Sequence, residues 1–114
     1  MNQDLYWAAL ITRLTLGILA QAQRDRATEL VIDPAIGAGR SVRYRIDDTW
    51  HEWSGPPSET VPDVVAELGR LAGFAKRPFP KEAPIDVPYS GVRLRWIIRM
   101  TSADGECILT PIEQ

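Results

Sequence analysis

The segment from residue 27 to residue 50, ATELVIDPAIGAGRSVRYRIDDTW, constrains the fold of this 114-residue chain more than any other part. Its apolar run at residues 30–32 is followed by an Asp-Pro pair, which is typical of a short strand and its end. At residues 42–46, apolar side chains alternate with Arg43 and Arg45, so one face of this strand is apolar and the other is cationic. The segment therefore predicts two β-strands, of which the second buries only one face.

An aspartate pair at residues 47–48 follows the second strand, and an aromatic stretch with Trp50 and Trp53 comes next. A two-residue connection between strand-like segments predicts a β-hairpin, although this one lacks the glycine that such turns usually contain. Exposed tryptophan beside arginine is a composition typical of protein contacts. We therefore predict an interface at Trp50 and Trp53.

Two amphipathic helices are expected around this hairpin. The first covers residues 4–26, where apolar residues recur at steps of three and four and so share one face. That face consists of Trp7, Leu10, Ile11, Leu14, Ile18 and Ala22. The second helix follows a linker at residues 55–58. Thr60 precedes it in a capping arrangement with a proline in the first turn, and Gly73 ends it.

The C-terminal third of the chain is predicted to be mostly β-structure. Residues 76–91 contain four prolines and little periodicity, which predicts a loop with one short edge strand near residues 85–87. Residues 92–101 are expected to form a strand, and residues 107–109 another one after a turn. The whole order predicts a single α+β domain over residues 1–114, with a mostly antiparallel sheet of about five or six strands and two helices packed on one face.

Composition and charge limit the expected partners and compartment. The net charge of −2 gives no overall electrostatic reason to bind nucleic acid. The single cysteine, Cys107, rules out an internal disulfide framework and fits a reducing compartment. No basic start precedes the N-terminal apolar stretch, and Arg13 interrupts that stretch, so neither a secretory signal nor a membrane span is expected. We therefore expect a cytoplasmic protein.

The sequence shows no constellation of residues that predicts catalysis. No GxxxxGK[ST] motif occurs, and the only lysines are Lys76 and Lys81, so this chain cannot assemble a P-loop nucleotide site. His51 is the only histidine, and its neighbouring carboxylates on a hairpin point to alternate faces, which is poor ligand geometry for a metal. We predict a non-enzyme with no cofactor and no metal, and an activity of unrecognised type is the alternative.

Several short motifs, in order and with similar spacing, resemble the N-terminal, PAS-like domain that precedes the motor in bacterial type II secretion and type IV pilus assembly ATPases. The family segment of the form ASDIHIEP is similar to ATELVIDP at residues 27–34, and the family's RxRIDG is similar to RYRIDD at residues 43–48. The first half of a KRxPQDG phrase is matched at residues 76–78. A late arginine strand followed by Gly-Glu is matched at residues 93–95 and 105–106. The resemblance covers nearly the whole chain, but the motor is missing.

The resemblance implies a role for three arginines. In the family, arginines of this domain lean like fingers toward nucleotide held by the motor, where a cation stabilises the transferring phosphoryl group. The matching residues are Arg43, Arg45 and Arg95. The chain departs from the family at Val31, where the family has histidine, and at Asp48, where the family has glycine. Without a motor, we expect these arginines to contact a protein partner, or a nucleotide that the partner holds.

The sequence thus predicts a non-catalytic protein-interaction or regulatory domain. Its partner would be a separate ATPase, a secretion or pilus component, or a second copy of the chain. One alternative is a small-ligand sensor with a pocket between the helices and the sheet, as in PAS-like domains. Another is single-stranded nucleic acid held by the arginines together with Tyr44 and Trp50. The net charge opposes this last alternative, and Tyr44 is expected to face away from the arginines.

Overall fold

The computed structural model describes residues 3–34, 42–53, 58–74, 78–102 and 105–112. The helices and strands along the chain are α1 (Gln3–Arg24), β1 (Glu29–Ile32), β2 (Val42–Ile46), β3 (Thr49–Trp53), a 3-10 turn (Ser58–Thr60), α2 (Val61–Leu71), β4 (Lys81–Tyr89), β5 (Val92–Met100) and β6 (Cys107–Pro111). Three segments lie outside the described residues. They are the segment at residues 37–40, whose Gly37 and Gly39 predict a turn, most of the linker at residues 55–58 and the basic pair at residues 76–77.

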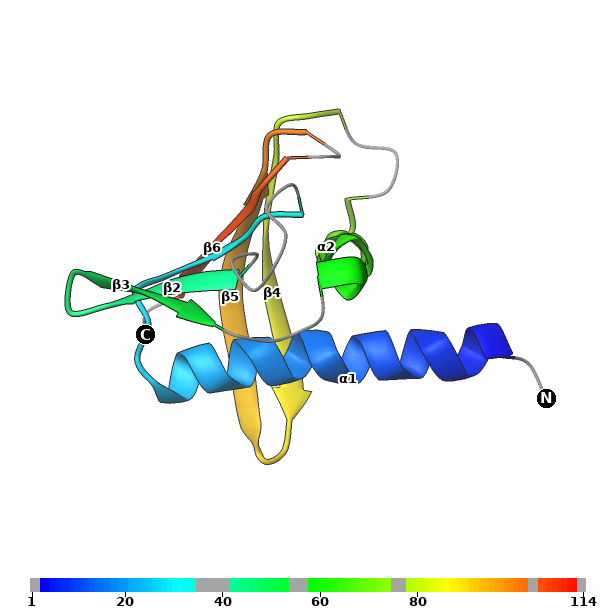
Figure 1. Ribbon diagram of the computed structural model, residues 1–114, viewed down its shortest axis with the longest axis horizontal. Helices are drawn as coiled ribbons and strands as arrows, with labels where there is room; N and C mark the ends of the chain where they lie inside the picture. Colours follow the sequence, from blue (N-terminus) through cyan, green and yellow to red (C-terminus); the bar gives the residue numbers. More distant parts are fainter. Residues whose placement is uncertain (1–2, 35–41, 54–57, 75–77, 103–104, 113–114) are drawn as a thin grey trace.

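Within the described residues, six strands form one antiparallel sheet in the order β3-β2-β1-β6-β5-β4 (Figure 1). The first and last strands of the chain, β1 and β6, pair at the centre of this sheet. Both helices pack on one face of it and share a core cluster with the strands. The predicted α+β class, with a mostly antiparallel sheet and two helices on one face, is confirmed.

The hairpin of β2 and β3 forms as predicted. Ile46 pairs with Thr49 across a two-residue connection, in which Asp47 and Asp48 have φ values of 51° and 64°. Positive φ at both central positions is what a turn of type I′ requires. Aspartate tolerates the left-handed region better than most residues, because its short polar side chain can bond locally, so the turn forms without glycine.

The core between the helices and the sheet is filled by large side chains. Trp96 on β5, Leu19 on α1 and Leu68 on α2 belong to one cluster, and none of them has exposed surface. The indole Nε1 of Trp96 has no hydrogen-bond partner among the described residues, so this residue contributes through its apolar area.

Helix α1 is longer than the surface that covers it. Burial begins at Ile11 and continues through Ile18 and Ala22, as the periodicity predicts. Trp7 and Leu10, which we expected on the same buried face, are exposed, so this part of the prediction is wrong. Figure 1 shows the reason, because the N-terminal end of α1 (blue) runs out past the sheet and past α2. Helical periodicity identifies the apolar direction but not how far the partner surface extends.

By length and composition alone, the same helix is long and apolar enough to cross a membrane. The stretch Leu5–Arg24 has a mean hydropathy of 1.3, although about a third of its most apolar window is buried inside the fold. Composition therefore does not support the expected absence of a membrane span. In this fold the C-terminal half of the stretch belongs to the core.

Helix α2 begins at Val61 with a proline in its first turn, as predicted. The N-cap residue Thr60 makes no side-chain capping hydrogen bond, so the predicted capping bond is wrong. At the other end Gly73 has φ of 72°, the left-handed conformation that closes a helix at low cost for glycine. The predicted end of the helix is therefore confirmed.

Strand β4 is much longer than the predicted edge strand at residues 85–87. It covers nine residues, includes Pro84 and Pro88, and pairs along its whole length with β5. Because β4 is the outermost strand of the sheet, its second side has no neighbouring strand in the ranges that the structure describes, and proline is tolerated where the missing N–H would point to solvent. The predicted strand was too short because the prolines were taken as evidence against any strand. Proline is unfavourable only in an interior strand.

Candidate functional site

The face of the sheet opposite the helices carries charged and aromatic side chains, among them Arg43, Arg45, Trp50 and Arg95. We call it the open face, because no helix in the described part of the chain covers it. Strand pairing defines one row of neighbours across it. From β3 to β4 this row consists of Glu52, Arg43, Val31, Ile108, Arg99 and Glu82. Paired residues lie on the same face, so the row has an apolar centre, an arginine on either side and a glutamate at each end.

Arg43, Arg45 and Trp50 form a compact group on this face. Arg45 and Trp50 are direct partners in the β2–β3 register. The guanidinium carbons of Arg43 and Arg45 lie 5.9 and 5.6 Å from the centre of the Trp50 ring. Both distances are within the range of a cation–π interaction, so the exposed indole holds two cations in place. The structure thus brings together three of the residues that the sequence predicted as contact residues.

The guanidinium groups of Arg43, Arg45 and Arg95 have hydrogen-bonding capacity that the fold leaves unused. Their ion pairs, to Glu106, Glu29 and Asp86, are 3.8, 3.4 and 3.5 Å long, which exceeds the length of a good N–H···O hydrogen bond. The Nε atom of each arginine is buried and has no hydrogen-bond partner in the described part of the chain, so the donors that a binding partner can reach are the terminal Nη groups. Each side chain is still 34–36 % exposed. These guanidinium groups are held in a fixed orientation but do not use all their hydrogen-bond donors.

Arg93 and Arg70 differ in this respect, whereas Arg99 also has only a long ion pair, at 3.8 Å from Glu82. Arg93 donates a hydrogen bond to Asp86 at 2.6 Å, and Arg70 donates two to Glu67 at 2.7 Å. Unsaturated guanidinium groups are therefore a feature of particular positions and not of every arginine in the chain.

Arg95 lies on the open face but does not belong to the group of Arg43, Arg45 and Trp50. It lies on β5, and β1 and β6 separate that strand from β2. Three strand spacings amount to about 14 Å, so the backbone of Arg95 lies well apart from the group of Arg43, Arg45 and Trp50. The open face has an arginine group on each side of an apolar centre at Val31 and Ile108, and it has no single arginine cluster.

Trp53 and His51 lie on the other face of the hairpin. Tyr44 stacks with His51 at 5.6 Å between ring centres and meets Trp53 edge-on at 5.8 Å. Trp53 is partly buried and packs against the core. Tyr44 faces away from the arginines, as predicted, and the two tryptophans predicted as one interface point to opposite sides of the sheet.

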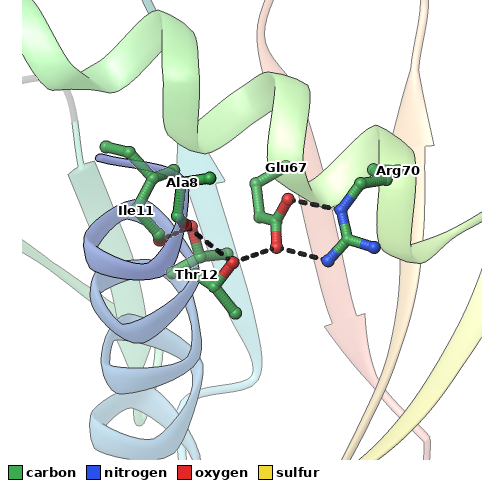
Figure 2. A network of polar contacts seen from close by, with 6 residues as sticks. Ala8, Ile11, Thr12, Glu67 and Arg70 are labelled. Carbon is green, nitrogen blue, oxygen red and sulfur yellow. Dashed lines mark hydrogen bonds and ion pairs between the residues drawn. The ribbon is translucent and has the colours of Figure 1, made fainter. Parts of the chain in front are cut away.

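A second polar site, which the sequence did not reveal, joins the two helices. The hydroxyl of Thr12 on α1 donates to the carboxylate of Glu67 on α2 at 2.7 Å, and Arg70 donates to both oxygens of the same carboxylate (Figure 2). The single hydroxyl proton of Thr12 has an alternative acceptor in the carbonyl of Ala8 at 3.0 Å. The charged acceptor is the stronger one, so the hydroxyl links the helices.

Glu67 lies on the buried side of α2, and this placement is the signal that sequence reasoning missed. The hydrogen bonds from Arg70 lower the pKa of Glu67, burial opposes this effect, and the hydrogen bond from Thr12 adds to it. The carboxylate also lines a groove of about 440 Å³ between the helices, together with Trp7 and Ile11 of α1 and Ala66 of α2. It is saturated by its partners, which indicates a structural link and not an acid or base.

The described residues offer little for catalysis or metal binding. No group of three histidine, cysteine or acidic residues with metal-binding spacing occurs among them. Cys107 is buried in the core, and burial raises the pKa of its thiol to about 12, so the nucleophilic thiolate is rare at neutral pH.

None of the known protein-family models matches this sequence, and a comparison with curated proteins gives no match either. The fold and the open face define an α+β domain with an arginine- and tryptophan-bearing sheet surface.

Proposed function

We propose that this chain is a non-catalytic protein-interaction domain that binds its partner through the open face. The group formed by Arg43, Arg45 and Trp50 is the contact element, and Arg95 is a second contact on the far side of Val31 and Ile108. The proposal places the domain in the cytoplasm, with a partner from a secretion or pilus system, such as a separate ATPase. It keeps the predicted relation to the N-terminal domain of those ATPases.

The observation that carries this proposal is the unsaturated state of the three arginines. Binding partners gain most from side chains that are already oriented and still have donors to offer, since little conformational entropy is lost on contact. Arg43 and Arg45 are fixed against the Trp50 ring, and their ion pairs at 3.8 and 3.4 Å leave room for better acceptors. Tryptophan and arginine are also the residues most enriched where protein interfaces concentrate their binding energy.

Acidic residues on the open face argue for a partner with mixed charge. Glu29 and Glu106 stand beside the arginines, and Glu52 and Glu82 end the central row. A nucleic acid backbone would be repelled by these carboxylates, whereas a protein surface can match both signs. The arrangement therefore favours a protein partner with carboxylates opposite the arginines.

The alternative ligand-sensor function would need space between the helices and the sheet. Trp96, Leu68 and Leu19 fill the middle of that layer without exposed surface. A hollow of about 370 Å³ lies at its edge, between α2 and the ends of β4 and β5, and the groove beside Glu67 lies between the helices. Thermal-shift screening with nucleotides, cyclic dinucleotides and metabolites tests this alternative, because a ligand that binds only the folded state raises the melting temperature.

The proposed function is tested by direct binding measurements. Each secretion or pilus ATPase of the same organism is immobilised, and binding of the purified chain is measured by surface plasmon resonance. We expect the Arg43→Ala/Arg45→Ala double variant to bind at least about tenfold more weakly than the unmodified chain. Trp50→Ala should weaken binding as well, because the two guanidinium groups lose the ring that orients them.

Arg93→Ala is the matched control. Arg93 lies on the same strand as Arg95, but its guanidinium group is already hydrogen-bonded to Asp86. Circular dichroism confirms that each variant is folded. The proposal is wrong if no ATPase or component of these systems binds, or if Arg93→Ala weakens binding as much as the double variant does.

A further inference from the structure

The open face carries a line of apolar side chains along the middle of the sheet. Val31 of β1 pairs with Ile108 of β6, and Ile97 of β5 lies on the same face one step further along. Ile112 continues β6 and donates its N–H to the carbonyl of Arg95. We call Val31, Ile97, Ile108 and Ile112 the apolar stripe. None of the four belongs to the core under the helices.

Arginines border the apolar stripe on both sides. They lie on β2 and β5, and neither strand contains an acidic residue. On the open face, the side chains of these two strands other than Ile97 are Arg43, Arg45, Arg93, Arg95 and Arg99. The outermost strands β3 and β4 carry acidic residues on this face, so the order across the sheet is acidic, basic, apolar, basic, acidic.

We propose that the open face binds an amphipathic α-helix of the partner. The helix lies along β6, with its apolar side on the stripe and with carboxylates on both flanks that pair with the arginines of β2 and β5. This inference rests on the proposed function, since it specifies the partner of the same face. The long ion pairs of Arg43 and Arg45, at 3.8 and 3.4 Å, leave Nη donors for such carboxylates.

The dimensions of the face match a single helix. The arginine-bearing strands β2 and β5 are three strand spacings apart, about 14 Å, and a helix with its side chains is about 10–12 Å wide. Arginines of both strands therefore reach its flanks, and the acidic residues of β3 and β4 lie outside it. From Ile108 to Ile112 the stripe extends over about 13 Å, which corresponds to between two and three helical turns.

A hollow at one end of the apolar stripe can receive an anchoring side chain. It has a volume of about 400 Å³, and Ile108 lines it together with Arg99, Glu82 and Glu106. Arg99 has only the ion pair of 3.8 Å with Glu82. A large apolar residue of the helix can enter this hollow beside Ile108 while a neighbouring carboxylate meets Arg99. Buried anchors of this kind carry much of the binding energy at protein interfaces.

The charge pattern disfavours a second copy of the chain on the open face. In a twofold packing of two such faces with aligned strands, β2 or β5 of one copy lies against β2 or β5 of the other. Arginines would then face arginines, and like charges in contact are costly. An extended peptide is disfavoured as well, since it gains backbone hydrogen bonds at the edge of a sheet and not on its face. A helix satisfies its own backbone and can lie flat on a sheet.

Three synthetic peptides of about 18 residues, or five helical turns, test the site. The first has leucines at helical spacing and glutamates on both flanks, and the second has lysines in place of the glutamates. The third has the composition of the first in an order that gives no apolar side. Titrations of the isotope-labelled full chain, followed by NMR, should show amide shifts at Ile97, Ile108 and Ile112 with the glutamate peptide. We expect this peptide to bind at least about tenfold more tightly than either of the others.

Reversal of charge on the two flanks gives a second test. The Arg45→Glu/Arg99→Glu variant should bind the glutamate peptide at least about tenfold more weakly and the lysine peptide more tightly than the unmodified chain does. Arg13→Glu is the matched control, because Arg13 is exposed on α1 in the helical layer, and it should leave both affinities nearly unchanged. Circular dichroism confirms that each variant is folded.

Several results would overturn the helix site. They are the absence of NMR shifts with the glutamate peptide at about 1 mM, equal binding of the lysine peptide or the rearranged peptide, and unchanged peptide preference in the double variant. A dimer of the unmodified chain in sedimentation velocity that the double variant alters would assign the face to a second copy instead.

Failure of the proposed function is distinguishable from these results. Binding of the glutamate peptide without binding of any secretion or pilus protein keeps the helix site and removes that class of partner. An ATPase that binds through Arg43 and Arg45 while the peptide does not bind removes the helix and keeps the proposed function.

Discussion

The link between the two helices predicts a defined loss of stability on substitution. In Glu67→Gln, the size of the side chain is kept and the charge is removed, so Thr12 and Arg70 lose a charged acceptor. A hydrogen bond to a charged group contributes about 1.5–3 kcal/mol, and we take the lower value for the Thr12 contact. The Arg70 side chain is 65 % exposed, so its ion pair with Glu67 contributes only about 0.5 kcal/mol. The expected loss is therefore about 2 kcal/mol at neutral pH.

This loss should depend on pH with a definite sign. The folded state lowers the pKa of Glu67 below its ordinary value of 4.5, chiefly through the hydrogen bonds from Arg70. The charged carboxylate thus stabilises the fold above pH 4.5, and this stabilisation is lost as the pH falls through the lower pKa of the folded state. The difference between the unmodified chain and Glu67→Gln should be full at neutral pH and should shrink in acid.

Urea unfolding followed by tryptophan fluorescence, at several pH values from about 7 down to about 3, measures both effects. At neutral pH we also expect a fall in the melting temperature of about 8 °C. Glu82→Gln is the matched control, since Glu82 and Arg99 form an exposed pair at 3.8 Å, and its loss should stay within about 0.5 kcal/mol. Equal stability of Glu67→Gln and the unmodified chain at neutral pH would refute the reasoning, and so would a difference that stays constant into acid.

Three further predictions concern the turn, the cysteine and the effect of salt. Asp48→Gly should raise the free energy of unfolding by about 0.5 kcal/mol in urea titrations, because φ of 64° is strained for aspartate and relaxed for glycine. Cys107 should resist a thiol reagent at about pH 8 in the folded protein and react at once in urea, as followed by mass spectrometry. Raising the salt concentration should weaken partner binding at the open face, measured by surface plasmon resonance, because this contact depends on arginine charge.

Much of the fold could be predicted from local sequence patterns. Alternation at residues 42–46 and the aspartate pair determine the hairpin, and the period of the apolar residues identifies both helices. The full length of β4 could not be predicted, since Pro84 and Pro88 are acceptable only on an outermost strand, and the order of the strands is not a local property.

Part of the candidate site could likewise be predicted from local sequence patterns, and part of it could not. That Arg43 and Arg45 share a face follows from their spacing of two residues, and their contact with Trp50 follows from the hairpin register. The distance of Arg95 from them depends on β1 and β6 lying between β2 and β5, which no short motif records. The Thr12–Glu67 bond joins residues that are 55 positions apart, so it appears only when both helices pack on the same face.

The open face has oriented charge around a small apolar centre of Val31 and Ile108, and charge determines the choice and speed of association more than its strength.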